Sequence, residues 1–538
     1  MALGLAVIFC VVSGFLLVSL CWPRGPLGPT SRKGGEKWGA PDPLLKASLT
    51  VPFGLGVFSV VFFLAQIAGI RKLLAVDLVT LAGLLAALML RRGRAGPFGA
   101  GPQGLKPSSI DLAGGSTKAA PFPGSNFAPN RGAKATKNNP AWLEPVVSAG
   151  FFVSVGAALY SAVLRMLAHP HGNGWDAFAI WNLHARFLFL GAGLGGEHWR
   201  DGYSTLIAWS HPDYPLLLPG AIAHFWSCLG RNDPAVPAII GFLFAFSTVG
   251  LLCVTLSMLR GRRCALLAGM ALLSTPTFID LGTWQYADVP LSFFFLATVA
   301  FLCLHDERVR TDSRSAGFLA LGGLSAGFAA WTKNEGLLFL CAIVFAVVWR
   351  MRVERRREGS AEGGVHSLVP LLLAMVPMVV VIVYFKRFVA PPGDLFSDPS
   401  TMLHKVLDPA RYWAVIQWYA SELFRFGHWL VVPGTLLLAG VYVAMGKTGE
   451  RLRHGAGFRA SMAALALTLA GYFAIYLLTP LDIYWHLRFS LDRLFLQVWP
   501  SAIFLVFLSI DSGNLCLSTT SQQRQSLPFA NERATKCT

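Results

Sequence analysis

Charge is scarce along this chain. Asp, Glu, Lys and Arg make up 14% of the 538 residues, whereas hydrophobic residues make up 54%. A soluble globular domain carries about 25% charged residues, so this composition excludes that class. It predicts an all-α polytopic membrane protein, because chains this apolar cross the bilayer as bundles of helices.

Acidic residues are the scarcer of the charged kinds. The chain has 28 Asp and Glu against 45 Lys and Arg, which gives a formal net charge of +17. Such an excess can indicate nucleic-acid binding, but here the basic residues gather in short loops between apolar runs, as the positive-inside rule predicts. No basic face exists outside those loops, so we expect membrane lipids and no nucleic acid as partners.

Paired cysteines are missing as well. The nine cysteines form no CxxC pair and no cluster with histidines at metal-ligand spacing. Several stand alone in apolar runs, namely Cys10, Cys228, Cys253, Cys303 and Cys341. This pattern excludes a disulfide framework and a thiolate metal site, and it predicts that the cysteines pack in the core or face lipid.

Apolar runs are abundant, and most are near the length that crosses about 30 Å of hydrocarbon. The first, Ala2 to Trp22, is long for the core of a signal peptide and has no small-residue cleavage site directly after it, so we expect a retained helix. We expect about thirteen spans, near residues 3–22, 48–69, 73–90, 145–166, 236–259, 264–281, 288–304, 315–331, 337–349, 366–388, 429–445, 459–479 and 494–510.

The apolar segment from Tyr214 to Gly230 decides the orientation of the helices. If it lies in the interface without crossing, the basic loops all fall on one side of the membrane, which is then the cytoplasm, with the N-terminus outside. If it crosses, these loops separate into two compartments, so we favour an interfacial or re-entrant segment. The loops concerned are 91–143, 260–263, 305–314, 350–359 and 447–459.

The polar segments divide the chain further. Residues 91–143 are rich in Gly, Pro and Ser, basic and without apolar periodicity, which predicts a disordered cytoplasmic linker between three N-terminal helices (1–90) and a larger unit (144–510). The tail 511–538 is polar, and we expect no structure there.

The opposite, extracytoplasmic face collects most of the ionisable residues near the spans. It receives two large loops, 167–235 and 389–428, and three short ones, 282–287, 332–336 and 480–493. These segments and the adjoining span ends hold Asp176, His184, His211, Asp213, Asp288, Lys333, Glu335, Asp482, His486, Arg488 and Asp492.

The stretch GWDAFAIWNLHARFLF contains Asp176 among aromatic and aliphatic residues. A helix that starts at Ala177 would lie in the interface as an amphipathic element. Asp176 is then either its N-cap, accepting N–H bonds from the first turn, or a catalytic acid. His184 and Arg186 are either substrate contacts or interfacial anchors whose polar ends reach water.

Four further motifs carry the remaining candidates. HPDYPLLLPG combines His211, Asp213 and Tyr214 with three prolines, and QYADVPLSFFFL sets Asp288 at the outer end of a span. AAWTKNEGLLFL sets Lys333 and Glu335 at an outer turn, where the positive-inside rule disfavours lysine and a phosphate ligand explains it. TPLDIYWHLRFSLDR adds His486, Arg488 and Arg493, whose arginine forks suit phosphate. A structural belt of ion pairs is the alternative for any one of them.

In this order, the motifs resemble those of the GT-C membrane glycosyltransferases, over about residues 144 to 510. The order is an acid in a long first external loop, a Pro-rich apolar stretch, an RxRR-type inner loop, an outer Asp and a TKNEG turn. The nearest branch is similar to the protein O-mannosyltransferase and aminoarabinose transferase group, which uses polyprenyl-phosphate sugars. The resemblance implies a bundle with interfacial helices in its first external loop, in a bacterial plasma membrane, with a lipid, polysaccharide or protein acceptor.

The resemblance also implies roles for residues. Asp176 matches the catalytic acid of the first loop, Asp288 the acid of the second, and Lys333 the lysine of an LTKG-like turn. His211 stands where a KPPL-like motif has a lysine that touches donor phosphate. The chemistry of the residues themselves, apart from the resemblance, adds Arg488 and Arg493 as phosphate contacts, and His184, Asp213, Tyr214, Glu335 and His486 as candidate substrate contacts.

These residues predict one chemical step. A polyprenyl phosphate is a good leaving group, so one base suffices: we expect Asp176 to deprotonate an acceptor hydroxyl that attacks the sugar C1 with inversion. Asp288 either orients the acceptor or shares a divalent metal with Asp176, although single acids without a DxD motif argue against metal. The rival interpretation is a transporter or flippase for a lipid-linked sugar or anion, which would carry charges near the bilayer midplane.

Overall fold

The structure is a computed structural model that describes residues 2–23, 41–93, 142–194, 198–309, 315–358, 368–393, 399–429, 434–445 and 455–510. Within these ranges every regular element is a helix and no strand forms. The predicted linker, apart from its first and last residues, and the predicted tail lie outside the described residues.

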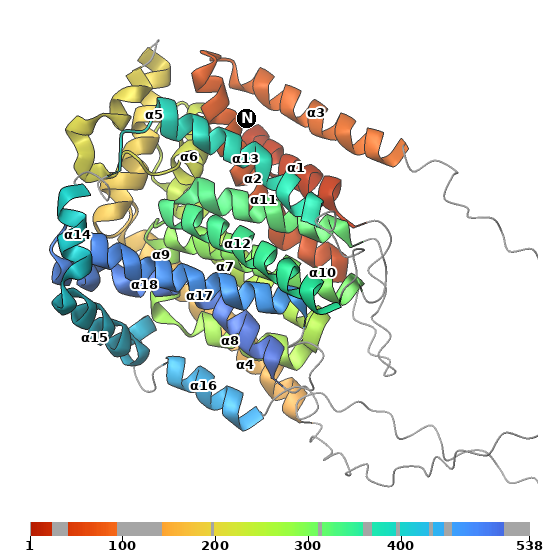
Figure 1. Ribbon diagram of the computed structural model, residues 1–538. Coiled ribbons are helices and arrows are strands. Elements are labelled where there is room, and N and C mark those ends of the chain that lie inside the picture. Colours follow the sequence, from red (N-terminus) through yellow and green to blue (C-terminus); the bar gives the residue numbers. More distant parts are fainter. Residues whose placement is uncertain are drawn as a thin grey trace, which may run out of the picture.

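The all-α polytopic membrane fold is confirmed. Ten of the described helices are long and apolar enough to cross a membrane, and the predicted thirteen is not confirmed. They are α1 (Ala2–Cys21), α2 (Pro41–Ile67), α3 (Leu73–Gly93), α4 (Leu143–Ala168), α7 (Ala235–Arg260), α10 (Asp288–Val309), α12 (Asn334–Glu358), α13 (Val369–Phe388), α17 (Ala456–Leu478) and α18 (Ile483–Ser509). Figure 1 shows most of these helices running side by side.

The predicted span 264–281 is broken in two. Helix α8 (Arg262–Leu273) and helix α9 (Pro276–Thr283) meet at an angle of 67°, and the pair counts as an eleventh span only if both halves are taken together. Pro276 explains the break, because proline disfavours a helical residue before it and cannot continue the ladder of hydrogen bonds. The predicted span 315–331 becomes α11 (Ala316–Thr332), and part of 429–445 becomes α16 (Gly434–Met445).

One end of the bundle is tied together by basic side chains. Arg91 at the end of α3 donates to the carbonyl groups of Ser19, Leu20 and Trp22 at the end of α1. Arg262 and Arg263 pair with Glu144 at the start of α4, at 3.4 and 3.7 Å.

Two more contacts join helix ends at this same end of the bundle. The Nδ1 atom of His305 lies 3.2 Å from the carbonyl oxygen of Ser315, and Arg260 donates to the carbonyl of Ile510. The basic loops predicted to share one side therefore adjoin helix ends that do lie together.

The opposite end carries the helices of the two large loops. The first loop forms η2 (Ala177–Trp181), α5 (Asn182–Leu194), η3 (His198–Tyr203), η4 (Thr205–Ser210) and α6 (Leu217–Leu229). The second forms α14 (Pro399–Leu407), α15 (Pro409–Arg425) and η8 (Phe426–His428). Helix α6 is only about 20 Å long at 1.5 Å per residue, which is short of the hydrocarbon thickness and agrees with a segment that does not cross.

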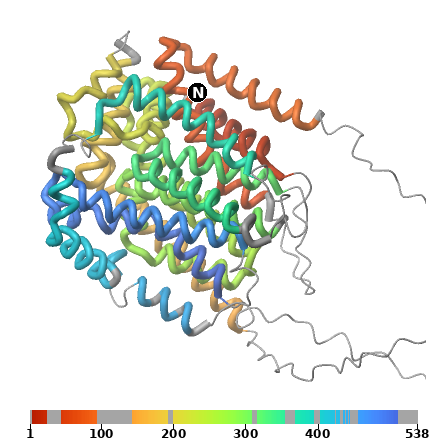
Figure 2. The backbone as a smooth tube through the Cα atoms, viewed as in Figure 1, coloured from red at the N-terminus to blue at the C-terminus, as the bar shows by residue number. Residues whose placement is uncertain are grey.

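The N-terminal helices pack into the same bundle as the rest (Figure 2). On α2, the ring of Phe53 lies 5.5 Å from that of Phe328 on α11 and 6.3 Å from that of Phe294 on α10. Helices α1 and α2 cross closely, because a Cβ atom on Gly14 would lie 1.9 Å from the carbonyl oxygen of Thr50. Figure 1 shows α3 on the outside of the bundle.

Helix α18 begins earlier than the sequence predicts. Residues 480–493 are predicted as an external loop, but the helix already begins at Ile483, because the carboxylate of Asp482 accepts the N–H of Trp485 at 2.8 Å and caps it. Arg488 and Arg493 are therefore five helical residues apart, which separates them by about 140° around the helix axis. They lie on different faces of α18.

Candidate active site

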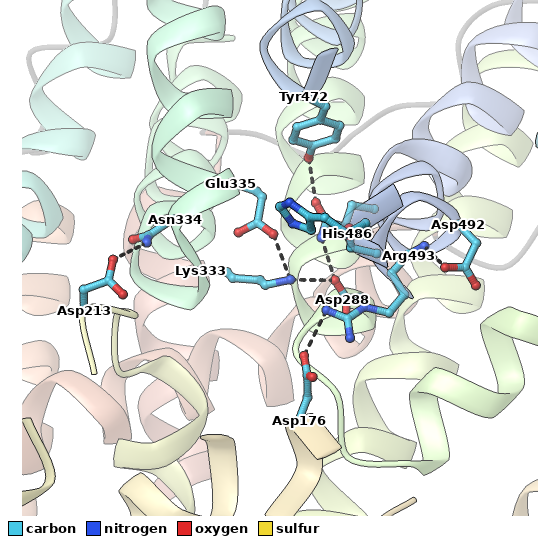
Figure 3. Close-up of polar contacts among 12 residues, drawn as sticks. Asp176, Asp213, Asp288, Lys333, Asn334, Glu335, Tyr472, His486, Asp492 and Arg493 are labelled. Carbon is cyan, nitrogen blue, oxygen red and sulfur yellow. Dashed lines mark hydrogen bonds and ion pairs between the residues drawn. The ribbon is translucent and has the colours of Figure 1, made fainter. Parts of the chain in front are cut away.

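Four predicted residues from four separate segments meet at the end of the bundle that carries the large loops. Asp176 precedes η2, Asp288 begins α10, Lys333 links α11 to α12, and Arg493 lies on α18. Figure 3 shows their side chains pointing toward one another. We call these four residues, together with Glu335 and Gln497, the charged network.

Asp288 is the buried centre of the charged network. Its side chain is 1% exposed, and its Oδ1 atom accepts hydrogen bonds from Lys333 Nζ at 3.1 Å and from Gln497 Nε2 at 2.5 Å. Its Oδ2 atom lies 3.6 Å from Arg493 Nε. That Oδ2 atom accepts no hydrogen bond but is buried, so neither carboxylate oxygen of Asp288 is accessible to an incoming acceptor.

Lys333 is held between two carboxylates. Its Nζ atom lies 3.1 Å from Asp288 and 2.8 Å from Glu335 Oε1. Burial alone would lower the pKa of Lys333, but the negative charges of Asp288 and Glu335 raise it above the ordinary value. The ammonium group stays charged at neutral pH and adds a fixed positive charge to the site.

Asp176 has a different environment. Its side chain is 14% exposed, and its Oδ2 atom pairs with Arg493 Nη2 at 2.9 Å. The alternative role as a helix cap is not observed, because the side chain of Asp176 caps no N–H; the helix begins at Trp175, one residue earlier, and continues as the π-helical turn η2. No described residue donates to the other carboxylate oxygen, Oδ1. One oxygen of Asp176 is thus anchored and the other is open.

The glycines of HGNGWD bring Asp176 into place. Gly174 has a φ of +85°, which a side chain would resist, and a Cβ atom there would lie 2.4 Å from the hydroxyl oxygen of Tyr286. The ring of Tyr286 also lies 5.1 Å from the guanidinium of Arg493. Burial, followed by the charge of Asp176, raises the pKa of Tyr286 to about 12, so the phenol remains protonated.

A second polar group lies beside the charged network. Asp213 Oδ2 accepts a hydrogen bond from Asn334 Nδ2 at 2.7 Å and lies 3.5 Å from Lys386 Nζ. Lys386 also donates to Asn334 Oδ1 at 2.8 Å and to the carbonyl of Asp213 at 2.5 Å. Asn334 follows Lys333 directly, so the TKNEG turn joins the two groups.

Tyr214 and His211 form a wall next to Lys333. Tyr214 stacks between Trp181, at 5.6 Å, and His211, at 4.9 Å, and Lys333 Nζ lies 5.9 Å from its ring centroid. Burial and then the charge of Glu335 raise the pKa of Tyr214 well above its ordinary range. His211 has a φ of 51°, a left-handed conformation that is costly for a residue with a side chain.

Two predicted site residues, His184 and Arg488, lie away from the charged network, and Figure 3 shows a third, His486, beside it. His184 is fully buried, with Nε2 at 3.1 Å from Ser210 Oγ, and burial lowers its pKa to about 3, so it is a neutral core residue. The Nδ1 atom of His486 lies 2.9 Å from Thr479 Oγ1. Arg488 is exposed and stacks on Phe489, at 5.6 Å, on another face of α18.

Four residues of the site are absent from the sequence-based set. They are Gln497, Tyr472, Lys386 and Asn334. The sequence does mark two of them. Gln497 is a lone amide inside an apolar span, and Lys386 is a lysine at the outer end of a span, to which the argument made for Lys333 also applies. The sequence does not mark Tyr472, because a tyrosine within an apolar run is ordinary.

The donor set does not suit a divalent metal between Asp176 and Asp288. The guanidinium of Arg493 lies between these two carboxylates, and Lys333 occupies the other side of Asp288. Within the residues that the structure describes, no three His, Cys, Asp or Glu side chains come together as a metal-binding group. The carboxylates already have cationic partners from the chain itself.

The fold and the site define an all-α polytopic membrane protein with a buried charged network at one end of its helices. Residues 235–388 match the family model described as dolichyl-phosphate-mannose-protein mannosyltransferase, a GT-C family. The matched stretch contains Asp288 and Lys333, whereas Asp176 and Arg493 lie outside it. No curated protein and no solved structure matches the chain. The match does not distinguish the aminoarabinose transferase branch.

Proposed function

We propose that this protein is a membrane glycosyltransferase that moves a sugar, with mannose the first candidate, from a polyprenyl phosphate to an acceptor hydroxyl. The observation that carries the proposal is the contrast between the two acids: Asp176 has an open carboxylate oxygen, and Asp288 has none. The family match over residues 235–388 supports the donor class.

The proposed step is a single displacement. The acceptor oxygen attacks C1 of the sugar while its proton passes to Oδ1 of Asp176. The bond between C1 and the phosphate oxygen breaks, and its electron pair leaves with the polyprenyl phosphate. Attack from the face opposite the phosphate inverts the configuration at C1. Because phosphate is a good leaving group, no general acid is required.

The cations have separate tasks in this step. Arg493 holds Asp176 in position through Nη2, and no described residue accepts from its remaining terminal nitrogen, Nη1, which is left as a donor for phosphate. Lys333 is too buried to reach a ligand directly, so it acts as a fixed positive charge that stabilises the charge accumulating on the phosphate. Lys386 is more accessible and is a further candidate for phosphate contact.

We further propose that the site faces the extracytoplasmic side of a plasma membrane. The basic helix ends of α3, α7 and α8 lie at the opposite end of the bundle from the charged network. Short basic loops remain in the cytoplasm in polytopic proteins. The site would then use a donor whose sugar is presented outside.

The test compares the wild type with Asp176→Asn in lipid nanodiscs, with synthetic polyprenyl-phosphate sugars as donors and a membrane extract as the acceptor source. We expect Asp176→Asn to lose about 10²- to 10⁴-fold in release of polyprenyl phosphate. The matched control is Asp201→Asn, an exposed acid in the same loop, whose rate should equal the wild type. Full activity of a folded Asp176→Asn would refute the role of Asp176, and no release with any donor would favour transport instead.

A further inference from the structure

A large groove lies on the other polar face of α18. It has a volume of about 1000 Å³ and lies between the N-terminal half of α18 and the end of α15 with the residues that follow it. Among its lining residues are Trp418, Glu422, Trp429, Trp485, Arg488 and Asp492. None of these contributes to the step proposed above, so the groove has no assigned task.

The helical repeat explains why one helix serves both regions. Trp485, Arg488 and Asp492 are spaced at i, i+3 and i+7, which places them on one stripe along the groove. Arg493 and Gln497 are spaced at i and i+4 on the stripe that faces the charged network. Figure 3 shows Asp492 beside Arg493, on the side away from Lys333. The groove therefore borders the proposed active site across the width of one helix.

One carboxylate in the groove lacks a partner. Glu422 on α15 is only 8% exposed as a residue, yet no described residue donates a hydrogen bond to its carboxylate. The indole Nε1 of Trp429 is buried against Gly427 and Gly434, so Trp429 offers the groove its ring and not its N–H group. A carboxylate that is largely removed from water is costly without a donor. A ligand in the groove that donates to Glu422 would satisfy it.

The charges and the aromatic rings narrow the class of ligand. Glu422 and Asp492 are balanced by Arg425 and Arg488, whose guanidinium groups stack on Trp418 and Phe489 at 5.4 and 5.6 Å. Two carboxylates disfavour a phosphate here, so a neutral ligand fits better. It needs hydroxyls that donate to carboxylates and accept from guanidinium groups, and apolar faces that pack on aromatic rings. Sugar rings have both properties.

We propose that this groove binds the acceptor, and that the acceptor is an oligosaccharide. The inference rests on the proposed glycosyl transfer, because a transferase needs a second site for its second substrate. In this proposal the sugar rings of the oligosaccharide lie against the tryptophans, and their hydroxyl groups donate hydrogen bonds to Glu422 and Asp492. The end of the oligosaccharide that accepts the new sugar extends past α18 toward Asp176. A polypeptide acceptor would need hydrogen-bond partners for its backbone amides, and only a few polar side chains of the groove could provide them.

The experiment measures binding without donor, so its outcome does not depend on sugar transfer. The full-length protein in nanodiscs is titrated against fluorescently labelled mannan, glucan and arabinan oligosaccharides of three to six sugars, and anisotropy reports binding. The groove variants are Trp485→Ala and Glu422→Gln. The matched control is Trp413→Ala, which removes an exposed tryptophan of α15 that does not line the groove.

We expect at least one oligosaccharide to bind, both groove variants to weaken it about tenfold or more, which corresponds to 1.4 kcal/mol, and the control to match the wild type. Trp485 is largely exposed, so its replacement should leave the fold intact. Absence of oligosaccharide binding, unchanged binding by both groove variants, or displacement of the probe by a Ser/Thr-rich peptide would overturn the proposal. Retained oligosaccharide binding in a protein that releases no polyprenyl phosphate would overturn the proposed function alone.

Discussion

The charged residues on the two polar faces of α18 have different surroundings. On one face, Arg493 and Gln497 contact Asp176 and Asp288, and every ionised group of the charged network has an opposite charge within 4 Å. On the other face, Arg488 stacks on an aromatic ring and Glu422 faces an open groove without a hydrogen bond.

This difference separates positions that hold the site together from positions that meet a ligand. A buried ion pair is costly to break, because the remaining charge loses its partner in a medium of low dielectric. A charge that faces solvent contributes little to stability. The charged network should therefore be intolerant of substitution, whereas the groove should tolerate it and show its importance only when ligand is present.

Removal of Lys333 should have the largest effect. Lys333→Met leaves Asp288 and Glu335 buried without their shared cation, and loss of one partner of a buried pair costs about 3–5 kcal/mol. We expect a large fall in the unfolding temperature, measured in detergent by intrinsic fluorescence. The exposed Lys72 supplies the control, as Lys72→Met should unfold like the wild type. Equal unfolding temperatures for the two variants would contradict a structural role of the network.

The second largest effect is expected from a conservative substitution of Arg493. Arg493→Lys keeps the charge but replaces the planar fork, which contacts Asp176 at 2.9 Å and lies 3.6 Å from Asp288, by a point charge that cannot serve both. We expect the release of polyprenyl phosphate to fall about 10²-fold, with a smaller loss of stability. The control is Arg231→Lys in an exposed pair with Asp233. A rate within a factor of about two of the wild type would remove Arg493 from the mechanism.

Replacement of Gln497, the uncharged member of the charged network, should have a smaller effect. Gln497→Leu removes the amide that donates to Asp288 and accepts from the hydroxyl of Tyr472 at 2.6 Å. The unpaired groups should cost about 1–3 kcal/mol of unfolding free energy. The double variant Gln497→Leu/Tyr472→Phe should recover part of that loss, because it removes one of the unpaired groups. No recovery would mean that Tyr472 finds another partner.

Gln497 also shows how far the sequence could predict this site. The apolar runs and the basic loops predicted the polytopic fold and which helix ends lie together, because both depend on average composition along the chain. Asp176, Asp288, Lys333 and Arg493 were predicted as single residues on one face. Which of them touch was not predictable, because it depends on the packing of α10, α11 and α18.

Arg488 illustrates the limit more sharply. It was grouped with Arg493 because both were expected in the last external loop, 480–493. The cap at Asp482 extends α18 to Ile483 instead, and the helical repeat then turns the two arginines to different faces. The predicted start of this helix was about ten residues too late, so two arginines that lie in different regions of the molecule were assigned to one site.

The pH dependence of stability should separate the groove from the network. Burial, and then the charge of Asp492, raises the pKa of Glu422 above its ordinary value of 4.5. A raised carboxyl pKa stabilises the fold below the ordinary value, and this contribution disappears as pH rises through the raised pKa. Glu422→Gln should therefore unfold at a slightly higher temperature than the wild type at pH 7, and at the same temperature near pH 4. A difference that grows on acidification would contradict this sign.

The smallest effect is expected at Arg488, and it completes the comparison. Arg488→Ala removes a guanidinium that is exposed and stacked on its neighbour Phe489, with no ion pair to any described residue. The unfolding free energy should change by less than about 0.5 kcal/mol, as at other surface positions. Arg493→Ala, five residues along the same helix, would leave Asp176 without its partner and reduce the positive charge beside Asp288. If the two alanine variants unfold at the same temperature, the two faces of α18 do not differ in the way that the contacts indicate.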